Sequence, residues 1–186
     1  PEYAPVPDLT HHTDTTVVGQ EAENIMMAWK FDKGASMQAD TLDVISDILS
    51  NSKAGLFDVD LNTPQKVMQA SAVVYPMHDY SILILSAIPN EGQSLESVRD
   101  LLLGEIEKLK KGEFNESLIK AVIANKRRDF LQKIDMNRAR VELMKDAFIL
   151  GKISPKRKLQ TLPIVTSTTA MCAYLSAWVR IQPYIK

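Results

Sequence analysis

Two apolar runs, each ending in proline, constrain the possible fold of this chain more than any other sequence feature. Residues 66–76 read KVMQASAVVYP and residues 79–89 read DYSILILSAIP, and only Met77 and His78 separate them. Both runs are rich in β-branched and aromatic residues, and each is long enough for one strand. A connection this short is typical of a hairpin. The runs therefore predict an antiparallel pair of strands.

The clearest helical signal follows this hairpin. Residues 94–112 read SLESVRDLLLGEIEKLKKG, with Ser94 as an N-cap, lysines in the last turn and Gly112 as the stop. Glu96 lies in the first turn, where the positive end of the helix dipole favours it. Apolar residues recur at spacings of three and four, which predicts a buried stripe of Val98, Leu101, Leu102, Ile106 and Leu109.

Further elements precede the hairpin. Alternation within residues 17–31 predicts a strand, and a helix is predicted over residues 38–51. The apolar residues of this helix are spaced by three and four: Leu42, Ile45, Ile48 and Leu49. We expect Gly55 to have a positive φ and to complete the turn after the helix. Residues 55–62 favour a further short helix, whose length Pro64 limits.

A long helical stretch follows the cap at Asn115 and extends from residue 116 to about 150. Its expected stripe consists of Leu118, Val122, Phe130, Ile134, Val141, Met144 and Phe148. Residues 167–179 then predict a helix, and residues 180–186 predict a short strand. This order of elements indicates an α+β fold with an antiparallel sheet covered by helices.

The first residues differ from the rest in composition. Pro1, Pro5 and Pro7 lie among polar residues, so residues 1–16 predict an extended connector. Residues 17–186 then form a single α+β domain. Because the chain begins at Pro1 rather than at methionine, we expect it to be cut from a longer chain.

The charge balance narrows the classes of partner. The chain has 22 basic and 23 acidic residues, a net charge of −1, whereas a dedicated nucleic-acid binder is normally basic. The basic cluster at residues 126–128 shares its helix with Asp129 and Asp135, which favours a solvated face. A second cluster at residues 156–158 is interpreted in the same way. The sequence has no apolar run long enough to predict a membrane span.

Candidate catalytic groups are few. The only histidines are His11, His12 and His78. Neighbouring His11 and His12 point in different directions on a helix or a strand, and His78 adjoins Asp79 at a turn, so no metal or cofactor site is expected in the chain. Cys172 lies on an apolar helical face and is interpreted as an inert buried thiol. We interpret five methionines as core filling: Met26, Met27, Met68, Met136 and Met144.

Several segments in order carry a family resemblance. They are EAENIMMAWKFDKGAS at residues 21–36, NSKAGLFDVDLN at 51–62, PNEGQSLESV at 89–98 and KKGEF at 110–114. Together with the hairpin, they resemble the second domain of pitrilysin/insulinase-type zinc peptidases, especially long bacterial members. The resemblance covers about residues 17–150 and implies the fold of the mitochondrial-processing-peptidase and LuxS-type metallohydrolases.

The resemblance also implies a role. In such proteins, homologous domains enclose a peptide, and zinc binds to a His-x-x-Glu-His helix of the first domain. This chain has no such motif. We therefore expect a non-catalytic domain that completes a chamber and cradles substrate. The implied partners are the catalytic domain of the same parent chain, which carries the zinc, and a peptide substrate. Self-association of the chain by itself is also expected, and the compartment stays open between bacterial periplasm and cytoplasm.

One substrate site carries over by position from insulin-degrading enzyme, where a substrate segment adds to a sheet edge as an extra strand. The corresponding residues here are Asn51, Ser52, Gly55, Gln69, Ser71 and Ala72. Strand addition needs an open edge with small neighbours, which residues 70–72 supply. The simpler interpretation is that residues 51–55 only cap the preceding helix.

Two other functions remain open. One is a non-enzymatic assembly subunit that shares the peptidase fold. The other is a small nucleic-acid-binding domain, which the charge balance disfavours.

Overall fold

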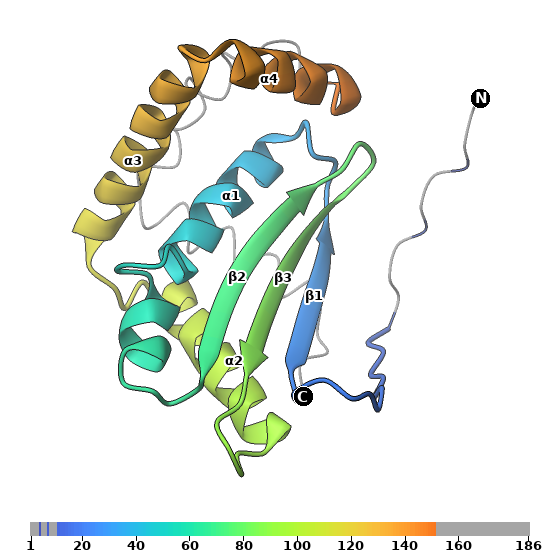
Figure 1. Ribbon diagram of the computed structural model, residues 1–186, viewed down its shortest axis with the longest axis vertical. Helices are drawn as coiled ribbons and strands as arrows, with labels where there is room; N and C mark the ends of the chain where they lie inside the picture. The colour runs from blue at the N-terminus through green and yellow to red at the C-terminus, as the bar shows by residue number, and fades with distance from the viewer. Residues whose placement is uncertain (1–3, 5–6, 8–10, 152–186) are drawn as a thin grey trace.

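The computed structural model describes residues 4, 7 and 11–151 (Figure 1). Three strands form one sheet: β1 (Ile25–Phe31), β2 (Gln69–Pro76) and β3 (Ser81–Ile88). Four α-helices accompany them in this part of the chain: α1 (Met37–Leu49), α2 (Leu95–Lys111), α3 (Glu116–Ile134) and α4 (Asn137–Ile149). The short η1 (Asp58–Asn62) is a π-helical turn between α1 and β2. The fold is α+β, as the sequence predicts.

The hairpin prediction is confirmed. The strand β3 lies between the other two, in the order β1-β3-β2, and both pairings are antiparallel. Its residues alternate strictly between buried and half-buried, as expected of a central strand with one face on the core. Since β2 lies at one side of this sheet, half of its backbone hydrogen-bonding groups point away from β3.

The core lies between the sheet and helices α1 and α2. The helix α1 packs against β2 and β3, and α2 contacts β1. The buried residues from α1 and the following turn include Leu42, Ile45 and Phe57, each 0% exposed. The other sheet face presents apolar side chains to solvent, among them Met26, Val73 and Tyr75. Among the residues that the structure describes, the sheet therefore has one packed face and one open apolar face.

The predicted caps of α2 are confirmed. The Ser94 side chain accepts a hydrogen bond from the Ser97 backbone N–H, and Gly112 ends the helix with φ of 73°. Val98, Leu102 and Leu109 are fully buried, and Leu101 and Ile106 pack against the core cluster. The sequence interpretation missed Glu105, a carboxylate on the same buried stripe that is 4% exposed.

The prediction of one helix over residues 116–150 is wrong. The helix α3 ends at Ile134, the chain bends at Asp135 and Met136, and α4 begins at Asn137. Only the first half of the predicted stripe reaches the core, where Val122 is buried and Leu118 is packed against it. Beyond the bend, α4 packs mainly against α3, and the last three members of the stripe are exposed: Val141, Met144 and Phe148.

The interpretation of the methionines as core filling is also wrong for most of them. Met26, Met68, Met136 and Met144 are 56% to 67% exposed, because they lie on the open sheet face, in a loop, at the bend and on α4. The first strand begins at Ile25, later than predicted, and Val17 and Val18 lie exposed before it. Within the described residues, no helix combines the length and apolarity that a membrane crossing requires.

Candidate functional site

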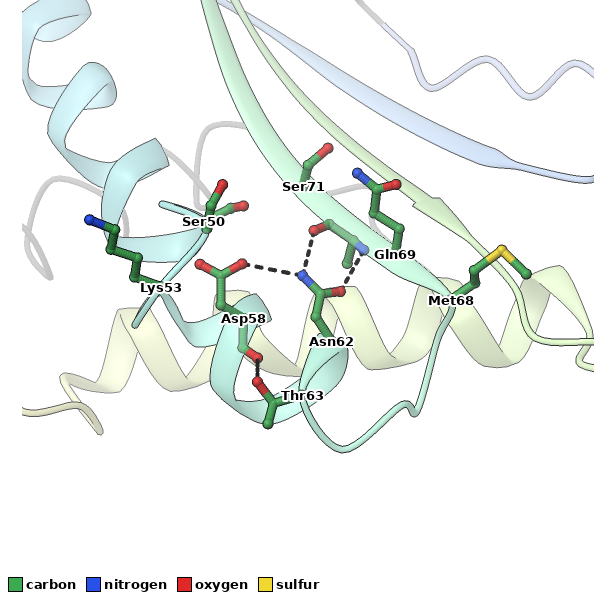
Figure 2. A pocket seen from close by; sticks show the side chains of 10 residues that line it. Ser50, Lys53, Asp58, Asn62, Thr63, Met68, Gln69 and Ser71 are labelled. Carbon is green, nitrogen blue, oxygen red and sulfur yellow. Dashed lines mark hydrogen bonds between the residues drawn. The ribbon is translucent and has the colours of Figure 1, made fainter.

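A polar depression lies where the turn after α1, the helical turn η1 and the start of β2 meet (Figure 2). Its volume is about 460 Å³. Three segments line it: Ser50, Ser52 and Lys53 from the turn, Asp58, Asn62 and Thr63 from η1 and its C-cap, and residues 68–71 at the start of β2. It is the place where the resemblance puts a substrate site.

Asp58 organises the wall of this depression. One carboxylate oxygen, Oδ2, accepts hydrogen bonds from the backbone N–H groups of Asn51 at 2.9 Å and Gly55 at 3.2 Å. The other oxygen, Oδ1, accepts one from the Asn62 side chain at 3.2 Å. Asp58 as a whole residue is 7% exposed. These hydrogen bonds therefore stabilise a carboxylate that solvent hardly reaches. Asp58 thus joins the turn to η1.

Gly55 is required in this turn, although the predicted reason is wrong. Its φ is not positive; the left-handed residue of the turn is Ser52, with φ of 64°. A Cβ at Gly55 would lie 2.6 Å from the Leu49 carbonyl oxygen and 2.9 Å from Asp58 Oδ2. The missing side chain therefore permits a close approach between the helix end and the Asp58 carboxylate.

Asn62 fixes the start of β2. Its Oδ1 accepts the backbone N–H of Ala70 at 2.7 Å, and its Nδ2 donates to the Ala70 carbonyl at 3.0 Å. Backbone groups of alternate residues in an antiparallel strand point to the same side. Those of Ala70, Ala72 and Val74 therefore point away from β3, toward the outer edge of the sheet.

The residues carried over by resemblance occupy this region unevenly. Ser52, Gln69 and Ser71 line the depression, and the backbone N–H groups of Asn51 and Gly55 bind Asp58 behind it. Asn51 also caps this turn, because its Oδ1 accepts hydrogen bonds from the backbone N–H groups of Lys53 and Ala54. Ala72 is 7% exposed, and the small side chains of this part of β2 let α1 pack closely against it.

The sequence interpretation missed Asp58 and Asn62. They stand four residues apart in NSKAGLFDVDLN, a spacing that places two side chains on one side of a helical turn. That spacing was the available signal, but the Asn62 partner lies eight residues further along the chain.

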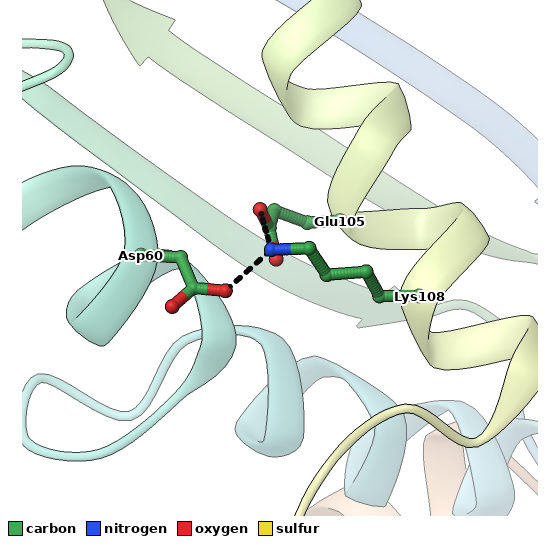
Figure 3. A network of polar contacts seen from close by, with 3 residues as sticks. All are labelled: Asp60, Glu105 and Lys108. Carbon is green, nitrogen blue, oxygen red and sulfur yellow. Dashed lines mark hydrogen bonds and ion pairs between the residues drawn. The ribbon is translucent and has the colours of Figure 1, made fainter.

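A charged network holds the other side of η1 (Figure 3). The Lys108 ammonium of α2 lies 2.6 Å from Asp60 Oδ2 and 2.8 Å from Glu105 Oε1. The hydrogen bond from Lys108 holds the pKa of Asp60 below its ordinary value, and the hydrogen bond to Asp60 raises the pKa of Lys108. Burial raises the pKa of Glu105, whose second oxygen has no hydrogen-bond partner. The turn η1 is therefore held both to β2 and to α2.

Two of the histidines lie beside aspartates on the surface. His12 lies 3.2 Å from Asp14, and His78 lies 2.7 Å from Asp79 at the hairpin turn, all on exposed side chains. Across the residues that the structure describes, no group of three or more His, Cys, Asp and Glu could hold a metal ion. The residues described here therefore do not fit the zinc of the resembling peptidases. Cys172 lies outside the described residues.

The basic cluster at residues 126–128 is only partly a solvated face. Arg127 and Arg128 are exposed as predicted, but Lys126 packs against α1 and pairs with Asp43 at 3.2 Å and Asp47 at 2.8 Å. Lys126 therefore has a structural role in joining α3 to α1. The cluster at residues 156–158 lies outside the described residues.

Solved structures with a similar fold include proteases and peptidase domains. By sequence, neither a protein-family model nor a curated protein matches the chain. A protease from Helicobacter pylori has a TM-score of 0.76 at 17% identity, over 83% of this chain and 38% of that one. This chain thus spans well under half of that protease. An M16-like peptidase from Alicyclobacillus acidocaldarius, named "putative", has a TM-score of 0.62 at 11% identity, over 82% of this chain and 37% of that one.

Some similar structures are close to this chain in length, and the following is one of them. It is the "inactive peptidase domain of a putative zinc protease" from Bordetella parapertussis, with a TM-score of 0.65 at 12% identity. The match covers 87% of this chain and 90% of that one. At these identities the comparisons establish the fold. The chain has the fold of an M16-like peptidase domain.

Proposed function

We propose that this chain is a non-catalytic, chamber-forming domain of a zinc-dependent endopeptidase and that it cradles the peptide substrate. The observation that carries the proposal is the match, over nearly the full length of both chains, to a domain named as inactive. The sequence adds that no His-x-x-Glu-His motif is present. In this proposal the zinc belongs to a catalytic domain of the same parent chain.

The apolar side chains on the open sheet face support the proposal that this domain forms part of a chamber wall. Met26, Val73 and Tyr75 expose 65%, 41% and 51% of their surface on the side of the sheet opposite α1 and α2. An apolar surface of this kind binds another protein surface or an extended peptide more readily than it remains in water. We infer that this face meets the substrate and that the catalytic domain lies across from it.

The edge of β2 is where a peptide would be held. Val74 directs its backbone N–H and carbonyl outward and is only partly buried, so a peptide strand can pair there. The polar depression lies at the start of the same edge, lined by Ser52, Gln69 and Ser71. Main-chain pairing would give the site affinity with little dependence on peptide sequence.

Alternate N-methylation of a peptide tests this proposal. We would measure the binding of fluorescein-labelled, unstructured peptides to this chain by fluorescence anisotropy. Two peptides of one sequence carry N-methyl groups on alternate residues, in opposite phase. A strand that pairs with one edge uses the N–H groups of only one phase. We expect one phase to weaken binding by tenfold or more and the other phase to leave it unchanged, as each lost hydrogen bond costs about 1 kcal/mol.

Equal weakening by both phases would contradict strand addition, and absence of binding to the unmethylated peptide would contradict the cradling role. The assembly-subunit alternative predicts the latter result. No catalysis is expected in any of these assays, since the proposal assigns hydrolysis to another domain.

A further inference from the structure

The Asn62 side chain occupies the hydrogen-bonding position that the first residue of an added strand would use. It binds both outward-facing backbone groups of Ala70, the N–H at 2.7 Å and the carbonyl at 3.0 Å (Figure 2). A side-chain carboxamide offers the same acceptor and donor as a peptide group. At Ala70, Asn62 thus takes the place of a neighbouring strand.

Several contacts hold Asn62 in this position. Asp58 Oδ1 accepts a further hydrogen bond from Asn62 Nδ2 at 3.2 Å, which orients the carboxamide so that its oxygen faces the Ala70 N–H. Asp58 is itself fixed by two backbone N–H groups of the turn after α1. On the other side of η1, Asp60 pairs with Lys108 of α2 at 2.6 Å. The carboxamide is therefore anchored from two directions.

At the other end of the β2 edge, a proline limits the pairing of an added strand. Pro76 also belongs to the outward-facing set of β2 but has no N–H to donate. Within the part of the chain that the structure describes, the groups that remain for pairing lie between these two ends, on Ala72 and Val74, with the carbonyl of Pro76. Ala72 is buried, so Val74 is the more accessible of the two outward-facing residues that can both donate and accept a hydrogen bond.

We propose that Asn62 is a specificity-determining stop that fixes the register and length of the peptide strand held at β2. The proposal rests on the peptide-cradling function above. A peptide pairs along the edge from Pro76 toward Ala72 and ends before Ala70, because the Ala70 backbone groups are already bonded. Only about four residues of an extended peptide fit this length at about 3.3 Å per residue. Longer substrates gain no further pairing unless Asn62 is displaced.

The Asn62→Ala variant tests the stop, and Thr41→Val is its matched control. The Thr41 hydroxyl of α1 donates to the Met37 carbonyl at 3.0 Å, so its loss also removes one side-chain-to-backbone hydrogen bond, at a residue that does not line the depression. We would measure anisotropy with labelled Val-Thr peptides that have extended segments of about four and about six residues. Thermal unfolding would establish that each variant is folded.

In the wild-type chain and in Thr41→Val, we expect the two peptides to bind equally. In Asn62→Ala, the longer peptide should bind roughly tenfold more tightly than the shorter one, because two backbone groups of Ala70 become available. A folded Asn62→Ala chain that does not discriminate between them would overturn the stop. If neither chain binds either peptide, the cradling function fails and the stop fails with it.

If Asn62→Ala does not fold, a measurement on the wild-type chain tests whether Asn62 limits the pairing. N-methyl groups placed singly along the longer peptide identify each N–H that pairs with β2. The stop predicts that methylation opposite Ala70 leaves the affinity unchanged and that methylation opposite Val74 reduces it roughly tenfold. A comparable loss opposite Ala70 would show that a peptide displaces Asn62 readily and would overturn the proposal.

Discussion

Helices α1 and α4 have the same length and opposite environments. Each has 13 residues, and both were predicted from apolar residues at helical spacing. In α1, the residues Leu42, Ile45 and Ile48 are buried against the sheet, whereas α4 has no buried residue. Among the described elements, α4 packs mainly against α3. Apolar periodicity thus predicts that a helix forms but does not predict what covers its apolar face.

The largest expected difference in the free energy of unfolding comes from replacing a phenylalanine with alanine in each of the two regions. Phe57→Ala, beside α1, removes a side chain that is 0% exposed, whereas Phe148→Ala removes one that is 89% exposed. We expect the first to lower the free energy of unfolding by about 3–5 kcal/mol and the second by less than about 0.5 kcal/mol. Urea denaturation measures both. Similar losses would mean that α4 is buried in solution and would invalidate the comparison.

Glycine substitutions sharpen the comparison within the packed region. Gly55→Ala places a Cβ 2.6 Å from the Leu49 carbonyl, and we expect it to destabilise the chain by about 2–3 kcal/mol. Gly104→Ala is the control, because its Cβ meets nothing within 4 Å in α2. The control should stabilise the chain by about 0.5–1 kcal/mol, since alanine favours helix. A Gly55→Ala chain as stable as wild type would remove the close-approach argument.

The charged network that joins α2 to η1 should respond to pH. The pKa of Glu105 is raised by burial, so its contribution to stability is greatest when it is protonated and is lost as pH rises through its folded pKa. Glu105→Gln keeps the shape without the charge. We expect it to increase stability at neutral pH by less than about 1 kcal/mol, with the gain fading below the ordinary range of a glutamate pKa.

The lowered pKa of Asp60 works in the opposite direction. Its contribution is present above its unfolded pKa and is lost as pH falls through its folded pKa, in both the wild type and the variant. Urea midpoints measured across this acid range separate the two groups. A Glu105→Gln chain that is less stable than wild type at neutral pH would contradict the assignment for Glu105.

The smallest effect on stability is expected for polar substitutions on α4. Val141, Met144 and Phe148 are 64%, 66% and 89% exposed, and changing all three to serine should alter stability little apart from helix propensity. It should nevertheless reduce self-association, which sedimentation across a concentration series measures. Arg140→Ser on the same helix is the control. A wild-type chain that is strictly monomeric would show that this apolar surface drives no association.

The features predicted most accurately from the sequence are those that depend on neighbouring residues. The Ser94 cap, the Gly112 stop and the hairpin each depend on neighbouring residues, and the structure contains them. The bend at Asp135 and Met136 was missed because the apolar spacing continues across it. The sequence also indicated Gly55 for the wrong reason, since the carbonyl that excludes a side chain there is brought close only by the fold.

The candidate site also contains contacts that the sequence did not predict, because they depend on the tertiary fold. The resemblance directed attention to the turn after α1 and the start of β2, which do lie together around one depression. It did not indicate that Asn62 would pair with Ala70, because that contact depends on how η1 is folded against β2. The resemblance therefore indicated the region of the candidate site, and tertiary contacts determine which backbone groups there are already hydrogen-bonded.

Residue-by-residue amide hydrogen exchange tests the central claim, that this chain holds an extended peptide at the edge of β2. Exchange would be measured with and without a saturating unstructured peptide. The account predicts that exchange slows at the Val74 N–H, stays unchanged at the Ala70 N–H, which Asn62 already binds, and stays unchanged along α4. Protection confined to α4 or to the open sheet face, with no change at β2, would contradict it.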